Sequence, residues 1–238
     1  MTETANDKAA RLDGIPVELW KTLHQQYKSA KNNEQHKYCN ITLVLTKVFK
    51  DIVEHGIMAG TAFNEGWMCP IYKKKEADNI ANYRPITVLN TDYKILTKAI
   101  ATCLTEIAPR IIHPDQAGFI RERSIFDQID QIITAINYAR LKEINGAIVA
   151  LDQEKVYDKV TDPYLWRILE KFAFPRETIN MIKILYKDTP TSVIINGCHG
   201  MTYLDLSSYQ FTHSLHHSRT NSFSFCLFSH FGHKEGKT

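Results

Sequence analysis

The chain has 238 residues, of which 44% are hydrophobic and 23% are charged, and its formal net charge is +3. This length and apolar content allow one large core or two modest domains. The small net charge is weak evidence for a polyanionic partner, and no stretch approaches the roughly 18 apolar residues of a membrane span, which excludes an integral membrane protein.

The N-terminus is polar and has no apolar signal segment. The five cysteines are scattered and form no C-x-x-C pair. An odd, unpaired set is typical of buried free thiols in a reducing compartment. The sequence therefore predicts a soluble, intracellular protein.

The first half of the chain predicts mainly helices. Pro16 opens a helix that runs to Tyr27, because proline is tolerated at a first helical position. Apolar residues at helical spacing predict a second helix from Ile41 to a stop at Gly56. A strand is expected at 67–72, and a helix with a continuous apolar face at 92–107.

The second half mixes helices and strands. Ser124 is expected to cap a helix that carries an isoleucine stripe, and Asp162 with Pro163 forms a cap and first-turn pair for another. Pro175 begins a helix that ends near residue 187. Strands are expected at 147–151 and 191–196, with Asn196-Gly197 as a hairpin turn. This order of elements predicts an α+β architecture.

Residues 201–238 differ from the rest of the chain. They hold five of the ten histidines and seven serines, and they show neither helical nor strand periodicity. We interpret them as a disordered tail that arose from a shifted reading frame or read-through. Cys226, His230 and His233 raise the alternative of a zinc site, but their spacing lacks the usual paired arrangement.

The apolar run at 147–151 leads directly into Asp152. One interpretation is that this carboxylate caps a helix or pairs with Lys155, since an isolated buried charge is costly. The other is that it binds a metal ion, because Mg²⁺ typically takes one or two carboxylates together with substrate phosphates. The residues alone leave both open.

Five segments occur in an order that is informative: GWMCPIYKKK, NYRPITVLN, DQAGF, ALDQEKVYD and TSVIING. In this order they resemble the reverse transcriptase domain of non-LTR (LINE-type) retrotransposons, over about residues 11–197. The resemblance implies the right-hand polymerase fold of fingers, palm and thumb. It divides the chain into an N-terminal helical extension (1–59), a fingers-like region (60–145), a partial palm (146–200) and an unrelated tail (201–238).

The resemblance also implies roles for individual residues. Asp152 is the catalytic aspartate that binds Mg²⁺, and the backbone carbonyl of Gln153 is a further ligand. Tyr157 lies under the incoming sugar as a steric gate. Lys73, Lys74 and Arg84 bind nucleotide phosphates, and Gln116, Gly118 and Phe119 contact the template and primer strands.

Two of these roles have alternatives. Between Gly66 and Arg123 there are nine Lys or Arg against six Asp or Glu, and before any motif is considered a solvated basic loop is the simpler explanation. Arg84 is a candidate for a surface ion pair with Asp78 or Asp92, and Phe119 is as compatible with core packing as with template contact.

The sequence after Gly197 contains no Y-x-D-D motif, which supplies the second carboxylate set in the family, and no thumb pattern. We therefore expect a catalytically incomplete fragment of an RNA-directed DNA polymerase, truncated before the second catalytic hairpin. Its implied ligands are an RNA template, a DNA primer, deoxynucleoside triphosphates and Mg²⁺, and no membrane. The alternative is a non-catalytic RNA- or DNA-binding remnant. No protein partner is predicted.

Overall fold

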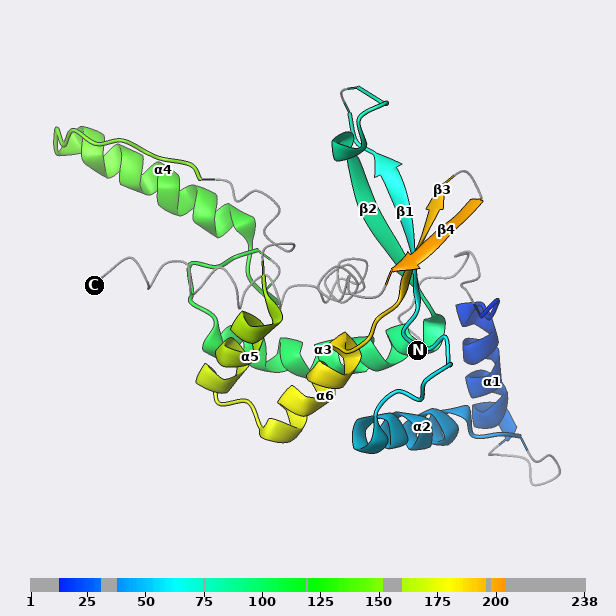
Figure 1. Ribbon diagram of the computed structural model, residues 1–238. Coiled ribbons are helices and arrows are strands. Elements are labelled where there is room, and N and C mark those ends of the chain that lie inside the picture. The colour runs from blue at the N-terminus through cyan, green and yellow to red at the C-terminus, as the bar shows by residue number, and fades with distance from the viewer. Residues whose placement is uncertain are drawn as a thin grey trace. The chain divides into compact units, whose positions relative to one another are not determined.

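The structure is a computed structural model that describes residues 13–30, 38–74, 76–118, 120–151, 160–195 and 198–203. It has the mixed α+β content that the sequence predicts (Figure 1). The described residues form two compact units: those up to 97 and from 174 onward make unit 1, and those from 98 to 173 make unit 2.

The elements follow one another as α1 (Val17–Ala30), α2 (Ile41–His55), β1 (Gly66–Tyr72), η1 (Ile80–Asn82), β2 (Tyr83–Leu89), α3 (Thr91–Ile111), α4 (Ile125–Leu141), α5 (Asp162–Lys171), α6 (Arg176–Tyr186), β3 (Thr191–Ile195) and β4 (Cys198–Tyr203). Helix α3 begins in unit 1 and ends in unit 2. None of the described helices is both long and apolar enough to cross a membrane.

Most predicted helix starts are confirmed by local chemistry. The hydroxyl oxygen of Ser124 accepts a hydrogen bond from the Phe126 amide at 3.2 Å, which satisfies one of the free N–H groups at the start of α4. Helix α5 begins one residue earlier than predicted, because Thr161 is its cap and Asp162 is already helical. A carboxylate in a first helical turn is favoured by the helix dipole.

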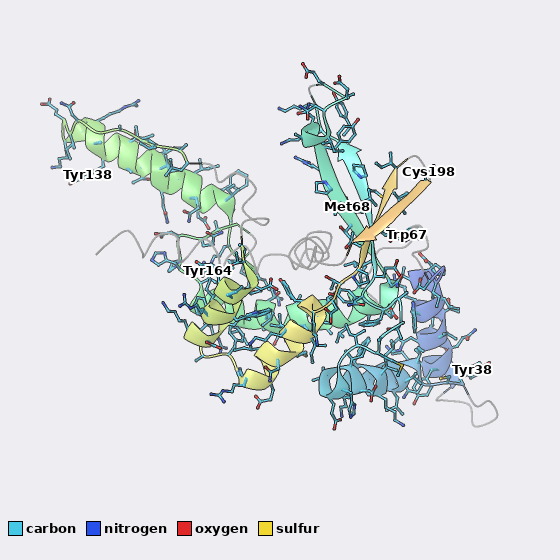
Figure 2. The ribbon with its side chains drawn as sticks, viewed as in Figure 1. Tyr38, Trp67, Met68, Tyr138, Tyr164 and Cys198 are labelled. Atoms are coloured by element: carbon cyan, nitrogen blue, oxygen red, sulfur yellow. The ribbon has the colours of Figure 1, made fainter. Side chains whose placement is uncertain are left out.

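The sheet belongs to unit 1 and has the strand order β2-β1-β3-β4. β1 pairs antiparallel with β2 over its whole length, but parallel with β3 only through Gly66–Met68. Trp67 and Met68, labelled in Figure 2, therefore lie where β1 is paired on both sides, with β2 and with β3. Beyond them, β1 and β2 continue as a two-stranded ribbon (Figure 1), which we call the arm (residues 66–89).

Strand β2 was not predicted, and it contains a proline. The structure places Pro85 inside β2, opposite Pro70. The Lys73 amide donates to the Asn82 carbonyl at 3.0 Å, and hydrogen-bonded pairs alternate along an antiparallel ladder, so Pro70 and Pro85 form a non-hydrogen-bonded pair. The missing N–H groups cost the ladder nothing at that position.

Strands β3 and β4 form the predicted hairpin. Ile195 pairs with Cys198 on either side of Asn196-Gly197, although these two turn residues lie outside the described residues. Residues 201–203, which were expected to begin a disordered tail, instead belong to β4, which pairs with β3. The tail from residue 204 onward lies outside the described residues, and so does its candidate zinc set.

The core of unit 1 is centred on Tyr93, whose side chain is fully buried. Its ring meets that of Phe63 edge-on, with centroids 5.4 Å apart, and its hydroxyl donates to the Leu185 carbonyl near the end of α6. Leu89 and Leu185 are also buried almost completely. The start of α3 is thereby fixed to the end of α6.

Asn90, between β2 and α3, is a buried polar connection in the same unit. Its amide nitrogen donates to the Ala62 carbonyl at 2.6 Å, and its side-chain oxygen accepts from the Asp13 amide at 3.3 Å. The neighbouring Thr91 hydroxyl donates to the Ile15 carbonyl. These bonds hold residues 13–15 against the start of α3.

Unit 2 has a smaller set of buried side chains, which come from α3, the loop after it and α5: Ile100, Ala101, Leu104, Ala108, Ile112, Ala117, Ile120, Leu165, Ile168 and Leu169. Helix α4 contributes no buried residue. Its Phe126 is 70% exposed, and Ile129, Ile132 and Ile133 are about half exposed.

The burial of the cysteine side chains differs from what the sequence predicted. The four described cysteines are free, as predicted, but Cys39, Cys103 and Cys198 are exposed and Cys69 is only half buried. Apolar sequence patterns around Cys103 indicated burial, yet a 21-residue helix such as α3 also presents a solvent face.

Candidate nucleic-acid interface

Lys73 and Lys74 lie at the outer end of the arm, and both side chains are exposed. Figure 1 shows that the loop joining β1 to β2 projects from the end of this ribbon. Because the loop follows directly from paired strands, its position relative to the ribbon is set by the ladder. A rigid ribbon carrying cations at its tip is suited to contact a polyanion.

Hydrogen bonds within the loop fix its conformation. The Tyr83 hydroxyl donates to the Ala77 carbonyl at 2.7 Å, and the Asn82 amide group donates to the Glu76 carbonyl at 2.8 Å. The rings of Tyr72 and Tyr83 meet edge-on with centroids 5.5 Å apart. The described residues of the loop are therefore held by their own side chains without a ligand, which lowers the entropic cost of binding.

Arg84 is exposed on β2, directly opposite Ile71 and one residue from the loop. Within the described part of the chain it forms no ion pair with Asp78 or Asp92. Asp92 instead accepts a hydrogen bond from the Tyr93 amide at 2.7 Å. Lys73, Lys74 and Arg84 together form what we call the basic tip of unit 1.

A second candidate set lies in unit 2, in the α3–α4 loop (residues 112–124). Gln116 is half buried there and Gly118 is exposed, and the Gln116 amide nitrogen donates to the Gly118 carbonyl at 3.3 Å. Phe119, predicted with them, lies outside the described residues. The loop is anchored by Ala117 and Ile120, both buried.

The strand predicted at 147–151 is not formed. These residues lie in no strand, and Val149 and Leu151 are 73% and 88% exposed. A strand needs a neighbour to satisfy its backbone groups, and the four described strands pair only with one another. The apolar run therefore has strand propensity without a partner among the described residues.

The predicted catalytic residues Asp152, Gln153 and Tyr157 follow that run and lie outside the described residues. Among the residues that are described, no group of three or more His, Cys, Asp or Glu side chains is placed to hold a metal ion. The roles of Asp152, Gln153 and Tyr157 therefore stay predictions.

Comparison with known proteins decides the family. A model of the family described as "Reverse transcriptase (RNA-dependent DNA polymerase)" matches residues 71–207, more than half of the chain. The chain belongs to the reverse transcriptase family. The matched region of this reverse transcriptase domain contains the basic tip, the α3–α4 loop and the segment of Asp152.

Two relatives indicate which branch of the family is involved. The chain is 31% identical over 195 residues to the transposon TX1 uncharacterized 149 kDa protein of Xenopus laevis, covering 80% of the chain and 14% of that protein. It is 26% identical over 123 residues to the retrovirus-related Pol polyprotein from the type-1 retrotransposable element R2 of Popillia japonica, covering 52% of the chain and 17% of that protein. The reverse transcriptase domain is therefore related to proteins of non-LTR retrotransposons, and it spans under a fifth of their length.

Sequence reasoning missed one side chain of the site, Arg123. In the structure its guanidinium group donates to the backbone carbonyls of Pro109, Ile112, His113 and Gln116. No local sequence signal marks these bonds, because the acceptors are backbone carbonyls 7 to 14 positions earlier in the chain.

Proposed function

We propose that the chain is the fingers-like region (60–145) and first part of the palm (146–200) of a right-hand RNA-directed DNA polymerase from a non-LTR retrotransposon. Residues 1–59 would be a helical extension. Because strand β4 and the family match both extend past residue 200, the tail unrelated to the domain would begin after residue 207. The family match over residues 71–207 supports this proposal most strongly. The template is RNA, the primer is DNA and the substrates are deoxynucleoside triphosphates.

The basic tip binds phosphates in this proposal. Lys73 and Lys74 are point charges on an ordered loop, and Arg84 offers a planar fork that can bind two phosphate oxygens at once. Their exposure and the internally bonded loop support this role. The α3–α4 loop, through Gln116, Gly118 and Phe119, contacts the template and primer.

Asp152 and the backbone carbonyl of Gln153 hold Mg²⁺ in this proposal. A carboxylate and a carbonyl are hard oxygen donors, which is the ligand chemistry that Mg²⁺ prefers. The ion supplies charge neutralisation at the reacting phosphates when it is bound. Tyr157 excludes a 2′-hydroxyl by filling the space that this group would need.

The chain by itself is proposed to be unable to extend a primer. The residues after Gly197 include two acidic side chains, Asp205 and Glu235, and neither lies in a Y-x-D-D sequence. Two-metal phosphoryl transfer needs carboxylates that hold both ions. The second candidate function, binding of RNA or DNA without catalysis, agrees with the exposed basic tip.

The test compares binding and extension by the full chain. A fluorescent RNA template annealed to a DNA primer is titrated at several salt concentrations, and primer extension is followed with Mg²⁺ and deoxynucleoside triphosphates. We expect salt-dependent binding without extension. Extension that Asp152→Ala abolishes would show that the chain is catalytically complete.

A matched pair of variants tests the basic tip. Lys73→Gln with Lys74→Gln should reduce the slope of log affinity against log salt by roughly two, since each lost phosphate contact removes roughly one. Lys47→Gln with Lys50→Gln removes the same charge from exposed positions of α2 and should leave the slope unchanged. Equal slopes for the two double variants would refute the role of the basic tip.

A further inference from the structure

The Arg123 side chain links the α3–α4 loop to the end of α3. The Arg123 guanidinium donates through Nη2 to the carbonyls of Pro109 at 3.1 Å and Ile112 at 3.0 Å, and through Nη1 to those of His113 and Gln116 at 2.5 and 2.8 Å. One residue at the end of the loop is thus bonded to its beginning and its middle.

The chemistry at the end of α3 explains why an arginine is suited to this position. The last carbonyls of a helix have no partner within the helix, and a cation near them is favoured by the helix dipole. Arginine alone presents several N–H donors in a rigid planar fork. A lysine has one nitrogen, which cannot replace two nitrogens that serve separate carbonyls.

The backbone conformation just before Arg123 directs its side chain toward the end of α3. Glu122 has a φ of 65°, in the left-handed region that non-glycine residues seldom adopt, and the Arg123 amide donates to the Ile120 carbonyl at 3.3 Å. Such a conformation costs of order 1 kcal/mol or more and persists where the surroundings impose it. Here the buried Ile120 and the four guanidinium bonds impose it.

We infer that Arg123 is a positioning residue for template–primer binding, acting through Gln116. By holding the Gln116 carbonyl, it fixes the backbone from which the Gln116 side chain faces the nucleic acid. This inference rests on the proposed function of the loop. It assigns Arg123 no contact with phosphate.

The test uses the full chain and the labelled RNA–DNA template–primer. Arg123→Gln is compared with Arg121→Gln, which removes the same charge two residues away from an exposed side chain paired only loosely with Glu122, at 3.6 Å. We expect Arg123→Gln to bind about tenfold more weakly than Arg121→Gln, the loss of about one good contact. The two salt slopes should be equal.

A double variant shows whether Arg123 acts through Gln116. Arg123→Gln combined with Gln116→Ala should bind no more weakly than Gln116→Ala alone, because the positioned group is already absent. Additive losses would overturn the inference. So would a salt slope that falls by one in Arg123→Gln relative to Arg121→Gln, since that marks a direct phosphate contact.

Hydrogen exchange on the unmutated chain keeps the inference testable if Arg123→Gln fails to fold. Bound template–primer should protect the amides of residues 112–118, and unchanged exchange there would overturn the inference. Absence of any binding by the unmutated chain would instead refute the proposed function. Normal binding by Arg123→Gln would refute only the role of Arg123.

Discussion

The Tyr93 hydroxyl donates to the Leu185 carbonyl across 3.2 Å, joining residues 92 positions apart in the sequence. Burial raises the pKa of Tyr93 well above its usual range, so the hydroxyl stays a donor. Tyr93→Phe should lower the free energy of unfolding by about 1–2 kcal/mol, because a buried carbonyl loses its partner. Urea denaturation followed by circular dichroism measures this. Tyr138→Phe, at an exposed position of α4 (Figure 2), should have almost no effect, and equal losses would contradict the prediction.

Asn90→Ala removes both bonds of a buried amide group, to Ala62 and to Asp13. We expect a loss of about 2–3 kcal/mol in unfolding free energy, because a carbonyl and an N–H are left unsatisfied. Hydrogen exchange should also become faster at residues 13–15. Asn137→Ala, on the exposed surface of α4, is the matched control. Unchanged exchange at residues 13–15 would show that Asn90 does not hold this segment.

Asp92 gives a prediction about pH. Burial, the largest cause, raises the pKa of its carboxyl above the ordinary 3.8; the nearby Asp13 adds to this rise and the Tyr93 amide opposes it. The folded protein therefore binds this proton more tightly than the unfolded chain, and the charged carboxylate costs stability above its folded-state pKa. The cost is relieved as the pH falls through that pKa toward 3.8.

Asp92→Asn should accordingly be more stable than the unmutated chain at pH 7, with the difference shrinking as the pH approaches 3.8. Urea denaturation at a series of pH values measures the difference. Asp78→Asn, in the exposed part of the arm, should change stability little at each pH. A gain for Asp92→Asn that grows toward low pH would have the wrong sign.

The exposed apolar side chains of α4 should promote self-association, since large exposed apolar patches mark interaction or aggregation sites. Replacing Ile132 and Ile133 by Lys should reduce concentration-dependent sedimentation while changing unfolding free energy by about 0.5 kcal/mol or less, as is usual for surface positions. Ile168→Lys is the contrasting control, because this side chain is only 2% exposed and its substitution should unfold the chain. Unchanged sedimentation of the double variant would refute the role of α4.

Short-range signals predicted much of the fold. Ser124 caps α4 and Asn196-Gly197 separates two paired strands because a cap and a turn depend on residues within a few positions. The strand at 147–151 and the missed β2 show the limit. Apolar composition indicates strand propensity, but a strand forms only where a partner lies beside it, and that depends on distant residues.

The candidate site shows the same limit. Lys73, Lys74 and Arg84 were predicted from motifs, and the sequence could not show that the hairpin between them is bonded internally by Tyr83 and Asn82. Asn90 was missed because its bond to Asp13 spans 77 positions and has no periodic signature. Arg123 was missed because its partners are backbone carbonyls, which every residue possesses.

The facing prolines of the arm affect whether another chain can add a strand to its edges. At a non-hydrogen-bonded pair, the N–H of each residue points outward from the ribbon, so Pro70 and Pro85 leave both margins of the arm without a donor at one level. A strand from another chain that paired with either edge of the ribbon would lack one backbone hydrogen bond at the proline. The rings of two residues thus discourage fibril growth along the part of the molecule that carries the proposed phosphate-binding tip.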